Sequence, residues 1–183
     1  MVRMLLRYKS WADELVFDSI AALPSEEAYK DRPTTFGNIV QTLSHVRVVD
    51  DIFRHHLECR PHGYTSRITP RAPSLTELRQ SVRGIDQWYV ETFDQWSDED
   101  LGVRVDFEFI GGRMGSMTRG EIALHVVNHA TYHRGFVGDM LKQVPFAWPP
   151  NDLTVFLRDH FSSAARFSRE RHEKTLLRNK EQG

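Results

Sequence analysis

The stretch TRGEIALHVVNHATYHRGFVGDM, residues 118–140, decides how this chain folds. Thr118 followed by a glutamate three residues later is a capping box, which marks the start of a helix. Three histidines, His125, His129 and His133, then recur at four-residue intervals. At about 100° per residue they share one face of the helix, which we expect to point into the protein. The apolar and aromatic residues expected on the same inward stripe are Ile122, Val126, Tyr132, Phe136, Val137 and Met140.

The opposite side of this helix carries smaller side chains: Leu124, Val127, Thr131, Gly135 and Gly138. Such a surface lets another helix or a second subunit approach closely. We therefore expect a homodimer, although the same surface could instead pack inside one chain.

Three more amphipathic helices precede this one. The first ends at Pro24, because proline cannot continue a helix. The second is expected to start at a Thr34/Thr35 cap and to run to about Cys59. The third opens with a capping box at Ser74. Its inward residues are expected to be Leu75, Leu78, Val82, Ile85, Tyr89 and Phe93.

A different pattern separates the third and fourth helices. Apolar residues alternate with charged ones from Val103 to Phe109, and Gly111 and Gly112 follow, so we expect a short β-hairpin. The fold class predicted is all-α, a four-helix bundle with this hairpin in the connection before the fourth helix. We assign residues 1–160 to the bundle and residues 161–183 to a charged C-terminal tail.

Composition narrows the function. The chain has 183 residues and a net charge of −1, so its overall charge does not favour nucleic acid. Cys59 is the single cysteine, which excludes an intrachain disulfide and cysteine-based zinc motifs. No segment has the apolar length of a membrane span or a signal peptide. We expect a cytoplasmic protein that binds neither nucleic acid nor membrane.

The three histidines at four-residue intervals indicate either a metal site or a set of hydrogen-bonded core residues. Burying three imidazoles costs several kcal/mol unless each is hydrogen-bonded or bound to metal. Core histidines satisfied by hydrogen bonds are one explanation, but two histidines four residues apart on a helix can also bind one metal ion. No glutamate lies between His129 and His133, so the HExxH motif of metalloproteases is absent.

The second helix offers a further histidine to such a site. His45 shares its face with apolar residues and is expected to point inward. Asp50 is expected on the charged side, paired with Arg54 four residues later. His56 is intermediate, on the inner face near the helix end. The charged side of this helix is expected to hold Arg47, Asp50, Asp51, Arg54 and Glu58, and the histidines expected in solvent are His55, His62, His160 and His172.

Four segments resemble the DinB-like family of metalloenzymes, also called YfiT-like, over roughly residues 1 to 160. They are LLRYKSWADELVFDSIAAL (5–23), LSHVRVVDDIF (43–53), GEIALHVVNHATYHRG (120–135) and PPNDLTVFLRD (149–159). The segment of the fourth helix is the most specific, and the others occur in the right order. This sequence departs from the family at Phe136, where glutamine is usual after His-Arg-Gly.

The resemblance implies a divalent metal held by His45, His129 and His133, with His125 beside the ligands. Three protein ligands leave a coordination position open, as in catalytic sites. Zinc is the metal expected first, with nickel or iron as alternatives. Further candidates for the pocket or for supporting contacts are His125, Tyr132, Asn128 and Glu121.

Relatives in this family include transferases and isomerases that use low-molecular-weight thiols, and proteins called hydrolases. We favour transfer of a thiol cosubstrate to a small electrophile, because no carboxylate base is apparent within a turn of the ligands. A hydrolase that uses a metal-bound hydroxide is the second interpretation. A metal-binding stress protein without catalysis is the third.

Overall fold

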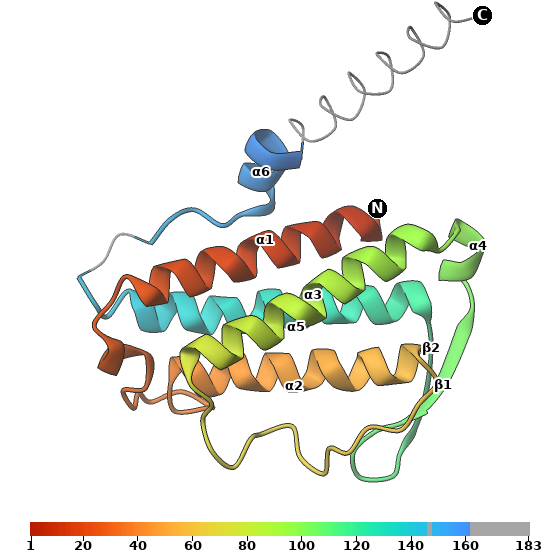
Figure 1. The fold of residues 1–183 in the computed structure, drawn as a ribbon, viewed down its shortest axis with the longest axis horizontal. Helices are drawn as coiled ribbons and strands as arrows, with labels where there is room; N and C mark the ends of the chain where they lie inside the picture. Colours follow the sequence, from red (N-terminus) through yellow and green to blue (C-terminus); the bar gives the residue numbers. More distant parts are fainter. Residues whose placement is uncertain (146–147, 162–183) are drawn as a thin grey trace, which may run out of the picture. The chain divides into compact units, whose positions relative to one another are not determined.

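Four long helices make up most of the chain: α1 (Val2–Ala21), α2 (Ile39–Leu57), α3 (Leu75–Gln95) and α5 (Arg119–Leu141) (Figure 1). The computed structural model describes residues 1–145 and 148–161. Helices α1 and α2 each pack against both α3 and α5. Figure 1 shows that α1 and α5 run in one direction and α2 and α3 in the other. The predicted all-α four-helix bundle is confirmed.

The shorter elements lie in the connections. A 3₁₀ turn, η1 (Ser25–Ala28), follows α1, and α4 (Asp98–Leu101) follows α3. The chain divides into two compact units, residues 1–149 and 150–183, and α6 (Leu153–Phe156) and the π-helical turn η2 (Leu157–Phe161) belong to the second. From residue 162 onward, the predicted tail lies outside the described residues. None of the helices in the described ranges is long and apolar enough to cross a membrane.

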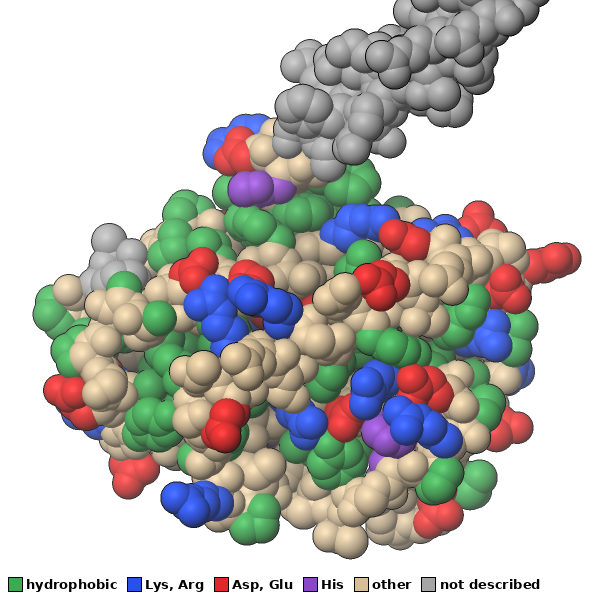
Figure 2. Space-filling model, viewed as in Figure 1, with side chains coloured by type: hydrophobic (Ala, Val, Ile, Leu, Met, Phe, Trp, Pro, Cys, Tyr) green, Lys and Arg blue, Asp and Glu red, His purple; other side chains and the backbone are tan. Residues whose placement is uncertain are grey.

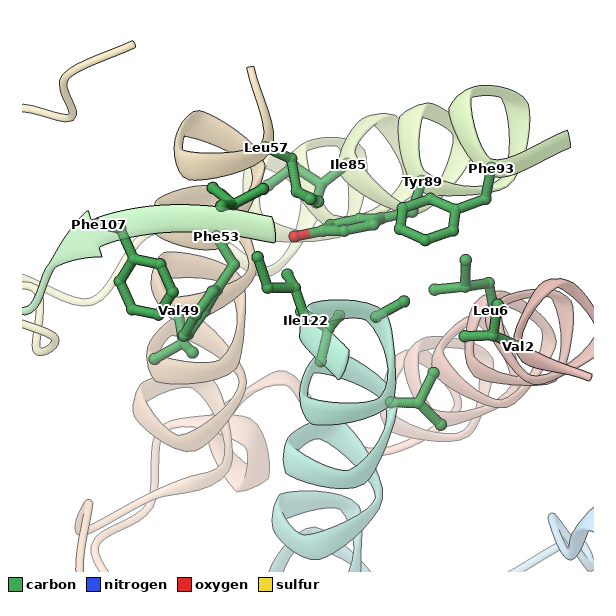
Figure 3. Packing of buried hydrophobic residues seen from close by; sticks show 14 residues of the cluster. Val2, Leu6, Val49, Phe53, Leu57, Ile85, Tyr89, Phe93, Phe107 and Ile122 are labelled. Atoms are coloured by element: carbon green, nitrogen blue, oxygen red, sulfur yellow. The ribbon is translucent and has the colours of Figure 1, made fainter. Parts of the chain in front are cut away.

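The predicted hairpin is present as β1 (Arg104–Glu108) paired antiparallel with β2 (Met114–Thr118). Its turn uses Gly111 and Gly112, which both have positive φ, a conformation that favours glycine. Val105 and Phe107 are buried against the bundle. The ring of Phe107 meets that of Phe53 on α2 nearly edge-on, with centroids 5.5 Å apart, so the hairpin closes one end of the core (Figure 3).

The capping boxes predicted at Ser74 and Thr118 are both formed. The cap predicted for α2 is wrong. Its N-cap is Asn38, whose side chain accepts a hydrogen bond from the backbone N–H of Gln41 at 2.9 Å. The helix cannot begin at Thr34, because the next residues form a turn in which Gly37 has a φ of 77°.

Two apolar clusters fill the bundle, one at each end. The cluster near the hairpin includes Leu6, Phe53, Tyr89 and Phe93 (Figure 3), and the other includes Phe17. Between them, the helices contribute buried or half-buried polar side chains, which we call the polar layer. Its members are Lys9, Asp13, His45, Asp50, Asp86, His129, His133 and Arg134.

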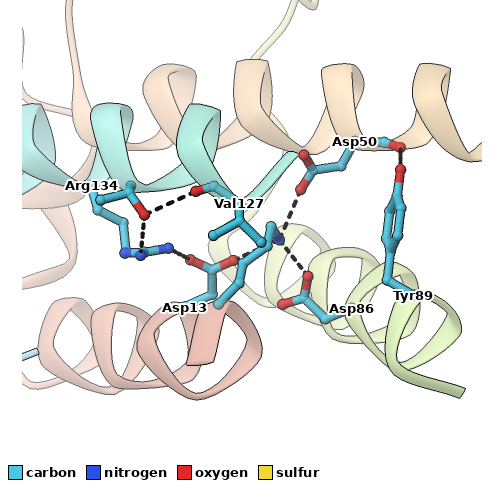
Figure 4. Close-up of polar contacts among 8 residues, drawn as sticks. Asp13, Asp50, Asp86, Tyr89, Val127 and Arg134 are labelled. Atoms are coloured by element: carbon cyan, nitrogen blue, oxygen red, sulfur yellow. Dashed lines mark hydrogen bonds and ion pairs between the residues drawn. The ribbon is translucent and has the colours of Figure 1, made fainter. Parts of the chain in front are cut away.

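A buried ion cluster occupies one part of the polar layer (Figure 4). Lys9 Nζ lies 2.9 Å from a carboxylate oxygen of Asp13, 2.9 Å from one of Asp50, and also contacts Asp86. Arg134 donates a second hydrogen bond to Asp13 at 2.9 Å. These residues come from all four long helices, so the cluster ties the bundle together at its centre.

The position of Asp50 corrects the sequence analysis. Asp50 and Asp51 are both buried rather than on an exposed charged face. Asp50 pairs with Lys9, whereas Arg54 pairs with Asp51 at 2.6 Å. The wheel of a single helix predicts one narrow buried stripe, but α2 packs against two neighbours and therefore buries a wider arc.

The same reason corrects the expectation that Val127 lies on the side of α5 away from the core. Val127 is buried, and so is Arg134, because α5 packs against α1 as well as α2. Tyr132, expected inward, is 62% exposed. The surface expected to accept a second subunit is divided, since Val127 lies in the core while Leu124 is 48% exposed.

Candidate metal centre

His45 on α2 and His129 and His133 on α5 converge in the polar layer. One ring nitrogen of each lies within 4.8 Å of those of the other two. Nε2 of His45 is 3.1 Å from Nε2 of His129. Two nitrogens bound tetrahedrally to one zinc ion would be roughly 3.3 Å apart, given Zn–N bonds of about 2.0–2.1 Å. The structure thus brings together three imidazoles at a spacing that could hold one metal ion.

Hydrogen bonding orients the first of these rings. The Nδ1–H of His45 donates to the backbone carbonyl of Arg67 at 3.0 Å. A carbonyl oxygen only accepts, so the proton sits on Nδ1 and the lone pair of Nε2 faces the other two imidazoles. This arrangement, a ring nitrogen anchored to a carbonyl and the other one free, is usual for metal-binding histidines.

The other two histidines carry ring nitrogens without partners. Nδ1 of His129 and Nδ1 of His133 are buried, and neither has a hydrogen-bond partner within the described residues. A buried nitrogen without a partner costs free energy. On His129 the nitrogen that faces His45 is Nε2, so a metal bound through Nε2 would place the ring proton on the unpartnered Nδ1. The donor set of three imidazoles fits zinc, nickel or iron.

Burial keeps these imidazoles neutral. It lowers the pKa of His129 to about 3, with further lowering from the neighbouring His133 and His45. Burial and His45 lower the pKa of His133 to about 4, and burial also lowers that of His45. Neutral imidazole is the form that binds metal, so the site needs no proton release at neutral pH.

A cavity of about 500 Å³ adjoins the cluster of three histidines at His129, on the hairpin side. His129 lines it, so the candidate metal centre can be reached from this space. The walls come from α2, α5, the hairpin turn and the connection between α2 and α3. Its lining residues are Val49, Ile52, Phe53, His56, Arg67, Phe109, Ile110, Arg113, His125 and His129.

The sequence profile of the DinB family matches residues 1–166. This chain belongs to the DinB family. It is 26% identical over 159 residues to Protein DinB of Bacillus subtilis, a match that covers 84% of this chain and 91% of that protein. Its fold resembles the crystal structure of a DinB-like protein from Bacillus cereus, with a TM-score of 0.60 at 19% identity, covering 80% of this chain and 94% of the other.

The other candidate residues of this DinB-family chain lie outside the cluster of three histidines. His125 lies beside the cluster, its ring centroid 5.6 Å from that of His129 and 4.6 Å from that of Phe53, and it lines the cavity. Tyr132 meets His133 edge-on at 5.1 Å but is mostly exposed. Asn128 is exposed, and Glu121 accepts a hydrogen bond from the backbone N–H of Thr118 as part of the helix cap.

Two of the histidines expected in solvent are more enclosed than predicted. The ring of His55 donates from Nδ1 to the backbone carbonyl of Asp51 at 2.8 Å. His62 is half-buried, with its ring 5.2 Å from that of His56. His160 is exposed as expected, and His172 lies outside the described residues.

Sequence reasoning missed Phe36, which covers the site. Its ring stacks on that of His45 at 4.4 Å and meets His133 edge-on at 5.5 Å. Phe36 lies in the turn before α2, where no helical or strand periodicity marks a residue as inward-facing. No pattern in the sequence pointed to this contact.

His56 gives a prediction about pH. Its ring stacks on Phe107, and burial, together with His62 and His55, lowers its pKa to about 4. Because the folded pKa lies below the unfolded value of about 6.5, the neutral ring favours folding above pH 6.5, and this contribution is lost as the pH falls through about 4.

We expect the free energy of unfolding of the metal-free protein to fall, relative to that of a His56→Gln variant, by up to about 1.4 kcal/mol per pH unit between pH 6.5 and 4. Urea unfolding of both proteins across this range measures the difference. A constant difference would contradict the assignment of a buried, neutral His56.

Proposed function

We propose that this protein is a metal-dependent enzyme that transfers a low-molecular-weight thiol to a small electrophile at His45, His129 and His133. The observation that carries the proposal is a set of three neutral imidazoles, one of which, His129, lines a cavity large enough for a small molecule. A divalent ion bound there would act as a Lewis acid that lowers the pKa of a thiol or a water in its open position.

The residues that line the cavity favour a thiol over water as the molecule that is deprotonated and reacts at this site. Within the described residues, none that lines the cavity carries a carboxylate, the base that hydrolases commonly use to activate water. A thiol loses its proton far more easily, since its pKa starts near 8.5 and that of water near 15.7. Cys59 is exposed at the end of α2 and is not part of the cavity, so the thiol is a cosubstrate.

Hydrolysis is the second candidate, and two imidazoles favour it. His56 and His125 both line the cavity, and burial lowers the pKa of each, so both are neutral bases at pH 7. Either ring could accept a proton from a water molecule beside His129. The non-catalytic metal-binding protein remains the third possibility.

The deciding experiment supplies zinc-loaded protein with cysteine, glutathione or 2-mercaptoethanol and with 1-chloro-2,4-dinitrobenzene. Sulfur displaces chloride, so a C–S bond forms, a C–Cl bond breaks and the thiol proton passes to a base. We expect conjugation that requires protein, metal and thiol together and that a His129→Ala variant loses.

The same preparation is given p-nitrophenyl acetate without thiol. Metal-dependent ester cleavage here, with no conjugation in the first assay, would reverse the order of the two reactions. If neither conjugation nor ester cleavage is detected, metal binding without catalysis is favoured.

The expected partners are also proposals. We propose a homodimer, to which the exposed Leu124 on α5 could contribute apolar surface. On the face seen in Figure 2, Lys and Arg side chains are interspersed with Asp and Glu. Mixed charge of this kind supports a small-molecule substrate over nucleic acid, which is bound by continuous basic surfaces.

A further inference from the structure

We propose that the cavity beside the three histidines binds a small molecule with an apolar body and a carboxylate group, and that Arg67 and Arg113 bind the carboxylate. This inference rests on the proposed function for its view of the ligand as a substrate. The binding itself can be tested without metal.

The inner wall of the cavity suits an apolar body. Val49, Ile52 and Phe53 come from α2, and Phe109 and Ile110 from the hairpin turn. The polar groups among them are the imidazoles of His56, His125 and His129. Apolar walls with few polar groups are typical of ligand sites.

Two arginines supply positive charge to this cavity. Arg67 comes from the connection between α2 and α3, and Arg113 follows the hairpin turn, so two separate segments bring them to one space. Within the described residues, neither guanidinium has an ion pair or a hydrogen bond. Other arginines of the bundle do have acidic partners, for example Arg79 with Glu14.

The position of Arg67 connects this charge to the candidate metal centre. Its backbone carbonyl accepts the hydrogen bond from His45, so the segment is held at the site. A metal ion at the three histidines would add further positive charge, and none of the described lining residues carries a negative one.

Charge and shape together select the ligand class. The planar guanidinium forms two parallel hydrogen bonds with a carboxylate, which gives arginine its preference for this group. Both arginines are exposed and therefore lie at the cavity mouth. The carboxylate would be held there, with the apolar body against α2 and the reacting end toward His129.

The test uses metal-free protein and three naphthalene probes of similar size: 2-naphthoate, the neutral 2-naphthamide and the cationic 2-naphthylmethylamine. Calorimetry gives the affinities. We expect naphthoate to bind at least about tenfold more tightly than naphthamide, since a hydrogen bond to a charged group contributes roughly 1.5–3 kcal/mol. Arg67→Gln and Arg113→Gln should each remove about tenfold of the naphthoate affinity and leave naphthamide binding unchanged.

Arg71→Gln is the matched control, because Arg71 is exposed in the same connection as Arg67 but does not line the cavity. It should bind naphthoate as the unaltered protein does. Equal affinities for naphthoate and naphthamide, an equal loss in Arg71→Gln, or no binding of any probe would each overturn the proposal.

A zinc titration of the same proteins separates this proposal from the proposed function. Selective naphthoate binding in a protein that takes up no zinc would leave the carboxylate site standing and reject the metal-dependent enzyme. Zinc binding and thiol conjugation without preference for naphthoate would do the reverse.

Discussion

Replacing His129 or His133 with alanine is expected to lower zinc affinity by more than about a hundredfold and to abolish retention of one zinc ion per chain. Each variant removes one of three imidazoles whose ring nitrogens lie within 4.8 Å of one another. Loss of a group that merely supports a ligand costs about 10–100-fold in affinity, so loss of a ligand must cost more. His45→Ala should behave in the same way.

Elemental analysis after dialysis, together with titration against a chromophoric chelator, measures both quantities. His55→Ala is the matched control, because His55 lies on α2 like His45 but outside the cluster. His125→Ala should keep most of the metal, since His125 lies next to His129 without belonging to the group of three. Stoichiometric zinc in both His129→Ala and His133→Ala, or equal loss in His125→Ala and His133→Ala, would refute the ligand assignment.

Replacing Lys9 with methionine is expected to destabilise the protein by about 3–5 kcal/mol. Lys9 is almost fully buried and is shared by the carboxylates of Asp13, Asp50 and Asp86. Burial alone lowers the pKa of Lys9, but the three carboxylates outweigh it and raise that pKa well above its usual value. Methionine fills a similar volume and leaves the buried carboxylates with too little positive charge.

Asp86→Asn should cost much less than Lys9→Met. Burial, together with Asp13 and Asp50, raises the pKa of Asp86 to about 8 although Lys9 lowers it, whereas the pKa of Asp13 is lowered, so Asp86 is the carboxyl group of the cluster that depends less on Lys9. Because this folded pKa lies above the unfolded value of about 3.9, the contribution of Asp86 to stability is complete below that value and is lost as the pH rises through about 8. The unaltered protein should therefore lose more stability between pH 6 and 9 than Asp86→Asn does.

Urea unfolding of the metal-free proteins at pH 6, 7 and 9 measures these differences. Lys30→Met is the control, because the side chain of Lys30 is 61% exposed. If Lys9→Met does not fold, the double variant Lys9→Met/Asp86→Asn should recover part of the stability, since it removes one cation and one carboxyl group together. A loss in Lys9→Met no larger than that in Lys30→Met, or an equal loss in Asp86→Asn, would contradict this account.

Local patterns in the sequence were enough for most of the fold. The caps at Ser74 and Thr118 depend on hydrogen bonds within one turn of helix, so neighbouring residues reveal them. The hairpin follows from alternation and the two glycines. The row of histidines placed His129 and His133 on one helix face, and the apolar face of the second helix placed His45 inward. The family resemblance then implied that these three bind a metal.

Residues without a local pattern were not predicted. The N-cap of α2 is Asn38 rather than Thr34 or Thr35, because the chain makes a turn at Gly37. Phe36 lies in the same turn and packs on His45. The cavity depends on Arg67 and Arg113, which lie far from the histidines in the sequence and have no periodicity that marks them.

By itself, the sequence determined which residues share a face of each helix, because a turn of 3.6 residues sets that relation wherever the helix lies. Only the tertiary structure decided how much of each face is buried, since that depends on the number of neighbouring helices. Asp50 and Arg134 therefore lie in the core, and Lys9 contacts Asp86, which is 77 positions further along the chain. Buried charges are tolerated only where opposite charges meet them, and the packing of four helices brought those charges together.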